Sequence, residues 1–79
     1  MNKIIQIEQY TYNLEEGNFN IYVFPKDDLL EFYIERENYA NLYHCVGINV
    51  KDKPDDMNEF IKNNLDSWVF IVMNETEED

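Results

Sequence analysis

Apolar residues alternate with polar ones in three successive segments, and this period of two constrains the fold more than any other feature of the chain. The segments are residues 19–24, 29–37 and 42–50. Successive side chains of a β-strand point to opposite faces, so a period of two predicts strands that each bury one face. A further alternating segment, residues 3–14, precedes them, and turn-forming residues fill the short gaps between all four. Four strands with short connections predict an antiparallel meander that is covered on one face.

The alternation also predicts how individual strands are oriented. In the first segment Ile5 and Ile7 share one face, whereas residues 10, 12 and 14 fall on the other, so we expect a bulge or bend near Glu8–Gln9. Proline cannot continue a paired central strand, and we expect the second strand to end at Phe24, before Pro25. The last alternating segment predicts one shared face for Leu42, His44, Val46, Ile48 and Val50.

A helical period replaces the alternation after Pro54. Asp55 or Asp56 is a suitable N-cap, and Asp56 with Glu59 has the spacing of a capping box. Apolar residues then recur at intervals of three and four, which is typical of a helix that lies on a sheet; they are Met57, Phe60, Ile61, Leu65 and Trp68.

Residues 69–73 fit two structures. Their β-branched content favours a fifth strand, while the spacing of Leu65, Trp68 and Val72 continues the helix, and we predict a short fifth strand. The expected fold is therefore α+β: a four- to five-stranded antiparallel meander with one C-terminal amphipathic helix packed on one face. We expect residues 1–73 to form a single domain and residues 74–79, which include four carboxylates, to be an acidic disordered tail.

The chain is strongly acidic. Seventeen Asp and Glu against six Lys and Arg give a net charge of −11 in 79 residues, while 44% of the residues are hydrophobic. Disordered acidic chains lack such an apolar share, so we expect a folded protein with a fixed negative surface. The charge exceeds the magnitude of about 2–8 that solubility favours in a small domain. It suggests a basic protein partner and disfavours direct binding to nucleic acid or to an anionic membrane.

Residue types that catalysis or metal binding would need are scarce. His44 and Cys45 are adjacent on a predicted strand, so their side chains point to opposite faces and cannot act as base and nucleophile. One His and one Cys do not make a zinc site. The carboxylates between residues 52 and 59 do not match a calcium loop, because Lys53 and Pro54 interrupt them. We therefore predict a protein that is not an enzyme and that has no cofactor and no metal site.

The sequence also bears on location. The longest apolar run, Trp68–Met73, has six residues, whereas a membrane-spanning helix needs about 20. Met1–Lys3 leads directly into alternating residues rather than into the apolar stretch of a signal peptide. A lone cysteine, Cys45, cannot form an intrachain disulfide. We expect a cytoplasmic protein.

The clearest candidate site is the outward face of the third predicted strand, which carries Glu31, Tyr33, Glu35 and Glu37. Alternate residues of a strand are about 6.6 Å apart, close to the spacing of successive phosphates along a nucleic-acid strand. Carboxylates pair with Lys and Arg much as phosphates do, and a tyrosine among charges is typical of a protein-contact surface. Acidic residues that flank this strand or begin the helix complete the predicted partner-binding set; they are Asp27, Asp28, Asp52, Asp55, Asp56 and Glu59.

In size, charge and sheet-plus-helix layout the chain resembles the small acidic inhibitors of phages and mobile elements, such as anti-CRISPR proteins, inhibitors of repair or restriction enzymes, and nucleic-acid mimics. The resemblance implies a non-enzymatic inhibitor that occupies the basic groove of a nucleic-acid-binding defence protein. One alternative is an immunity protein that neutralises a basic toxin nuclease. Another is a structural subunit that forms a homodimer through an apolar patch of Tyr43, Cys45 and Trp68–Met73.

Overall fold

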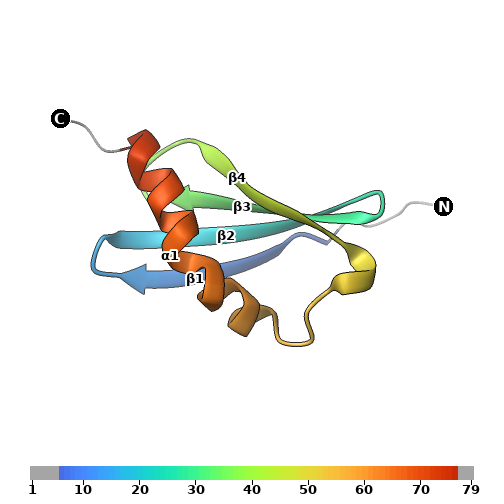
Figure 1. Cartoon of the computed structure of the whole chain (residues 1–79). Coiled ribbons are helices and arrows are strands. Elements are labelled where there is room, and N and C mark those ends of the chain that lie inside the picture. Colours follow the sequence, from blue (N-terminus) through green and yellow to red (C-terminus); the bar gives the residue numbers. More distant parts are fainter. Residues whose placement is uncertain (1–5, 77–79) are drawn as a thin grey trace.

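The computed structural model describes residues 6–76, which form one four-stranded sheet and one long helix (Figure 1). The sheet runs in the order β1-β2-β3-β4 with every neighbouring pair antiparallel. The predicted α+β meander with a C-terminal helix is thus confirmed. The elements are β1 (Glu8–Leu14), β2 (Gly17–Lys26), β3 (Leu29–Arg36), β4 (Leu42–Asn49), the short 3-10 helix η1 (Val50–Asp52) and α1 (Met57–Thr76).

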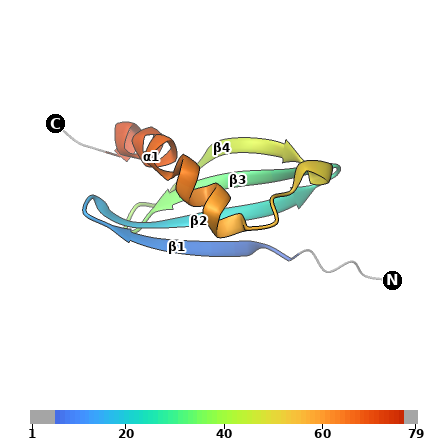
Figure 2. The same cartoon turned by 60° about the horizontal axis from the view of Figure 1, so that its bottom comes forward.

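Helix α1 crosses one face of the sheet and forms the second layer of the molecule (Figures 1 and 2). Phe32 lies fully buried between the layers, with its ring centre 5.3 Å from that of Phe60 and 5.6 Å from that of Trp68. The other face of the sheet is covered by no element of residues 6–76, and we call it the uncovered face. Alternate residues of β2 and β3 pack against the predicted helix stripe, and the core consists of Phe19, Ile21, Val23, Leu30, Phe32, Ile34, Met57, Ile61, Leu65, Trp68, Val69 and Val72.

Both ends of α1 are held by side chains. At the start, Asp56 Oδ1 accepts a hydrogen bond from the Glu59 backbone N–H at 3.1 Å, so Asp56 is the N-cap. At the other end, Arg36 Nη1 of β3 donates to Thr76 Oγ1 at 3.0 Å. The Thr76 hydroxyl in turn donates to the Val72 carbonyl at 2.7 Å. The last turn of α1 has no basic residue, and Arg36 places a cation beside the negative end of the helix dipole.

The predicted fifth strand is wrong, because residues 69–73 belong to α1. As a helix, this segment continues the apolar stripe and buries Val69 and Val72 against the sheet, with 6% and 0% of their surfaces exposed. Residues 74–76, which we expected in a tail, are helical as well. The remaining tail residues, 77–79, lie outside the described part of the chain.

The predicted bulge near Glu8–Gln9 is also wrong. The pairing of β1 with β2 is regular from its first residue to Leu14, which lies opposite Gly17. Tyr10, Tyr12 and Leu14 pack against the core, whereas Ile7 lines a groove on the uncovered face. The change of parity therefore reflects two sets of apolar residues that serve opposite faces of one sheet; Ile5 lies outside the described residues.

Strand β2 continues through Pro25 to Lys26, two residues beyond the predicted end. Pro25 lies opposite Leu30 of β3. On its other side β2 pairs with β1 only as far as Val23, so at Pro25 the strand has one neighbour instead of two. A proline is tolerated at such an edge position because only one side of the strand needs hydrogen-bond donors.

Strand β4 contains an irregularity that the alternation concealed. Phe32 lies opposite Val46, but the next residue of β3, Tyr33, lies opposite His44. Cys45 is thus an extra residue on β4, which makes a β-bulge.

The bulge reverses the facing of the first half of β4, so the predicted shared face is wrong. Val46 and Ile48 pack against the core beneath α1. Leu42 and His44 instead lie opposite outward-facing residues of β3, on the uncovered face. Val50, the last residue of the predicted set, belongs to η1. A single inserted residue shifts a strand by one position and sends its alternate side chains to the other face.

Candidate functional site

A row of aromatic rings crosses the uncovered face from β2 to β4. The Tyr22 and Phe24 rings are 6.4 Å apart, and Phe24 meets Tyr33 edge to face at 5.3 Å and 90°. Tyr33 then meets the His44 ring at 5.1 Å and 72°. We call Tyr22, Phe24, Tyr33 and His44 the aromatic row. It gives the uncovered face a strip of aromatic rings of the kind that is enriched in protein-contact surfaces.

Glu31 lies beside one end of this row. Its Oε1 is 2.8 Å from His44 Nε2, and its side chain is 18% exposed, against 50% for His44. The residue opposite Glu31 on β4 is Gly47, and a Cβ atom at that position would collide with Glu31 Oε1. The absence of a side chain at Gly47 therefore lets the Glu31 carboxylate lie flat across β4 and reach His44.

Glu35 is held by neutral donors. Its Oε1 accepts hydrogen bonds from Asn20 Nδ2 and from the Tyr22 hydroxyl, both at 3.0 Å. Burial, together with the hydrogen bond to Glu35, raises the pKa of Tyr22. In Glu31 and Glu35 alike, the side-chain hydrogen bonds found among residues 6–76 engage Oε1. Each carboxylate is fixed through one oxygen, and its Oε2 can accept a hydrogen bond from a bound partner.

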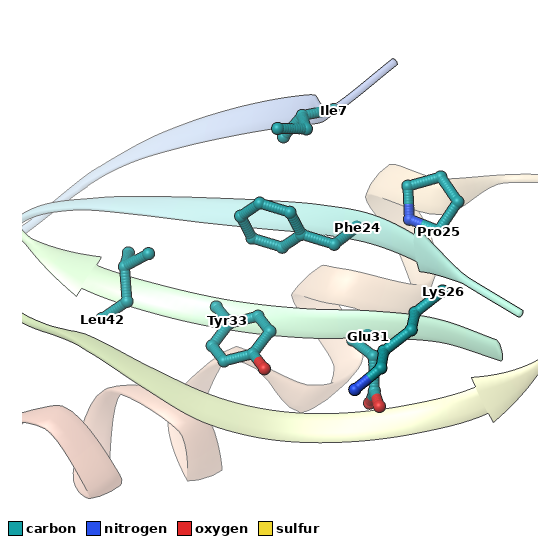
Figure 3. Close-up of a pocket in the computed structure, with 7 residues that line it drawn as sticks. All are labelled: Ile7, Phe24, Pro25, Lys26, Glu31, Tyr33 and Leu42. Atoms are coloured by element: carbon teal, nitrogen blue, oxygen red, sulfur yellow. The ribbon is translucent and has the colours of Figure 1, made fainter. Parts of the chain in front are cut away.

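A groove of about 500 Å³ lies on the uncovered face, with Glu31 in its lining (Figure 3). An adjoining hollow of about 330 Å³ shares Ile7, Phe24 and Leu42 with it and adds Glu35. We call the two together the sheet groove. Its central lining is apolar, with Glu31 at one end and Glu35 at the other. In Figure 3 the side chains stand on the near side of the sheet and α1 lies behind it; the labelled residues are Ile7, Phe24, Pro25, Lys26, Glu31, Tyr33 and Leu42.

The structure brings together only three residues of the predicted partner-binding set. Glu31, Tyr33 and Glu35 share the uncovered face, as the alternation of β3 predicted. Glu37 lies in the turn after β3. The row on β3 therefore has the expected order of carboxylate, aromatic ring and carboxylate, but it is one carboxylate shorter than expected.

The other predicted acidic residues lie in two further places. Asp27 and Asp28 form the β2–β3 turn, and the Asp28 carbonyl accepts a hydrogen bond from Val50, next to Asp52 of η1. Asp55, Asp56 and Glu59 lie at the start of α1, on the opposite side of the sheet from the groove. Burial, followed by the charge of Asp56, raises the pKa of Tyr12 on that side. None of these six side chains lines the sheet groove.

Sequence reasoning missed half of the groove. Phe24 was expected only as the end of a strand. Leu42, and His44 next to the groove, were predicted to share a face with Val46 and Ile48, which pack against the core. The signal that could have found them is His44 itself, a polar residue in a row of otherwise apolar alternate positions. Gly47 is a second signal, since a glycine within a strand often marks a close approach by another group.

The structure also bears on catalysis and metal binding. Cys45 packs against the core while His44 lies on the uncovered face, which confirms their predicted separation. Burial raises the pKa of the Cys45 thiol to about 12. Among residues 6–76, no three His, Cys, Asp or Glu side chains come together in a way that could hold a metal ion. Within the same residues, no helix is both long and apolar enough to cross a membrane.

Compared with known proteins, the chain matches no family model, no curated protein and no solved structure.

Proposed function

We propose that this protein is a non-enzymatic inhibitor that binds a basic, nucleic-acid-binding protein through the uncovered face of its sheet. The observation that carries the proposal is the pairing of two immobilised carboxylates, Glu31 and Glu35, with the aromatic row between and beside them. Surfaces of this composition suit Lys and Arg side chains, which pair with carboxylates and pack their carbon stems on aromatic rings. The net charge of −11 adds long-range attraction for a basic partner.

The geometry supports a mixed surface better than a pure imitation of a phosphate backbone. Tyr33 stands where the middle carboxylate of a regular array would be, and Glu37 lies beyond the end of β3. We therefore propose that the protein occupies a basic groove through two carboxylates and a central apolar contact. The partner is a defence protein of the kind that phage inhibitors block, and the site of action is the cytoplasm. An immunity protein against a basic toxin nuclease is the alternative with the same binding chemistry, and gene order beside a toxin would favour it.

Self-association through the predicted apolar patch has less support. Trp68, Val69 and Val72 of that patch are core residues, and Phe70 is the member that is widely exposed, at 66%. Two copies that each carry a charge of −11 also repel one another.

A capture experiment with charge-matched variants tests the proposal. The immobilised protein is offered the heparin-binding fraction of a host-cell lysate, with washes of rising salt and with DNA as a competitor. The test variant carries Gln in place of Glu31, Glu35 and Glu37. The control variant carries Gln at three exposed carboxylates outside the groove, Glu15, Glu16 and Glu75.

We expect the wild type and the control to retain the same basic protein at moderate salt and to release it when DNA is added. The test variant should lose it at a lower salt concentration. Because both variants change the net charge equally, equal retention by the two variants would contradict the proposal.

A further inference from the structure

The sheet groove has features that specify its ligand more closely than charge alone. Its centre is lined by Ile7, Phe24, Tyr33 and Leu42, which supply carbon surface from β2, β3, β4 and the residues before β1. Ile7 and Leu42 are 52% and 43% exposed, so apolar surface here is open to a partner. A cation alone would leave this surface wet, and a ligand that fills the groove needs an apolar side chain at its middle.

The carboxylates at the two ends of the groove set the distance between the groups that a ligand must present. Glu31 and Glu35 are four residues apart on β3, which places their Cα atoms about 13 Å apart in an extended strand. Tyr33 lies midway between them on the same face. An extended peptide has the same period, so its residues i, i+2 and i+4 point one way at intervals that match the three positions.

We propose that the sheet groove binds an extended segment of the partner in which an apolar residue is flanked, two positions away on each side, by Lys or Arg. The inference rests on the proposed function, since it assigns to the basic partner the segment that contacts Glu31, Tyr33 and Glu35. The apolar residue fills the groove over Phe24 and Tyr33. The flanking cations donate hydrogen bonds to the free Oε2 atoms of the two carboxylates.

The two ends are not equivalent. Glu31 contacts His44, and Lys26 lines the same end of the groove. The donors to Glu35, Asn20 and Tyr22, are neutral. The Glu35 end therefore retains the greater negative potential, and the cation bound there contributes more to affinity than the cation at Glu31.

Synthetic peptides provide defined probes. The first contains Arg-Ser-Leu-Ser-Arg at its centre; the second has Ser in place of Leu; the third keeps the composition but places both Arg residues on one side of Leu. Each is titrated into the ¹⁵N-labelled full chain, and amide shifts are followed by NMR. The protein variant Leu42→Ser opens the groove at an exposed position, and Phe70→Ser on α1 is the matched control.

We expect saturable shifts at the amides around Phe24, Tyr33 and Leu42 with the first peptide. Loss of the central Leu should weaken binding roughly tenfold, since it removes most of one buried aliphatic side chain. Leu42→Ser should weaken binding and Phe70→Ser should not, and Glu35→Gln should cost more affinity than Glu31→Gln.

Several results would overturn the inference. Equal binding of all three peptides would mean that charge alone attracts them, which leaves the proposed function standing without the groove. Binding of no peptide would exclude the segment, while the capture experiment would still test the basic partner separately. Without peptide, the amide shifts of the groove residues could instead grow with protein concentration and added salt. That result would assign the groove to a second copy of this chain, because salt relieves the repulsion between two acidic copies and weakens attraction to a basic ligand.

Discussion

Replacing Gly47 with alanine is expected to displace Glu31 from its position without unfolding the protein. A Cβ atom at position 47 would collide with Glu31 Oε1 and come within 3.2 Å of its Cδ. The φ angle of Gly47 is not positive, so alanine can adopt the same backbone conformation. The carboxylate is the far end of a flexible side chain and can swing away, but it then leaves His44 Nε2, which is now 2.8 Å from Oε1.

The expected change in the free energy of unfolding is small because two contributions oppose each other. The Glu31–His44 pair is half-exposed on its His44 side, and such pairs contribute about 0–1 kcal/mol. Replacing glycine by alanine within a strand raises the free energy of unfolding by about 0.5–1 kcal/mol, since it reduces the entropy of the unfolded chain. The net change should lie within about 1 kcal/mol, which is less than about 8 °C in Tm for a chain of this size.

Urea denaturation and side-chain NMR of His44 together test this reasoning for Gly47→Ala. We expect a nearly unchanged urea midpoint, altered His44 imidazole resonances, and His44 resonances in Glu31→Gln that also differ from the wild type. A loss of more than about 2 kcal/mol would mean that the backbone or a larger group has to move, contrary to this prediction. Unchanged His44 resonances would refute it equally, because the carboxylate would then not have been displaced.

Four further predictions concern the core, the helix end and the titratable groups. Phe32→Ala should lower the free energy of unfolding by about 3–5 kcal/mol, because Phe32 is fully buried; a urea midpoint close to that of the wild type would contradict this. Arg36→Met should weaken the end of α1 by about 1 kcal/mol through loss of the hydrogen bond to Thr76, seen as roughly fivefold faster amide exchange near Thr76 and not at the helix start. The Cys45 thiol, whose pKa burial raises from 9.0 to about 12, should react with iodoacetamide at pH 8 more than about tenfold more slowly than a free thiol, because the smaller thiolate fraction outweighs the higher nucleophilicity of that thiolate; labelling at the free rate would contradict the raised pKa. Burial and the hydrogen bond to Glu8 also raise the pKa of Tyr10 from 10.0 to about 12. Because Tyr10 and Cys45 lose their protons at lower pH in the unfolded chain, the stability that they contribute is present below about pH 9 and is lost as the pH rises toward 12. A Tm that stays constant between pH 8 and 11 would contradict this direction.

The general fold was predictable because each layer has its own period. Residues 19, 21 and 23 and residues 30, 32 and 34 alternate as buried strands do, and the stripe from Met57 to Trp68 has helical spacing. Residues 69–73 were assigned wrongly because a short apolar run fits either structure. Tertiary contacts determine that these residues are helical. As a helix they bury Val69 and Val72 against the sheet, and Arg36 of β3 donates a hydrogen bond to Thr76 at the helix end.

The candidate site was predictable only as far as one strand extends. Glu31, Tyr33 and Glu35 follow from the alternation of β3 alone. The groove also needs residues from β2, from β4 and from before β1, and their facing depends on the extra residue at Cys45. Local patterns specify the face of a residue relative to its own strand neighbours, whereas a bulge is set by the pairing with another strand.

Hydroxyl-radical footprinting of the captured complex shows whether the partner lies on the uncovered face of the sheet. Aromatic side chains on both sides of the sheet can be labelled. Tyr22 and Tyr33 lie on the uncovered face, Tyr12 packs on the covered side, and Phe70 is exposed on α1. Labelling is compared by mass spectrometry between the free chain and the complex. We predict strong protection of Tyr22 and Tyr33 with unchanged labelling of Tyr12 and Phe70. Protection of Phe70 or Tyr12, with Tyr33 labelled as in the free chain, would mean that the partner does not bind the uncovered face.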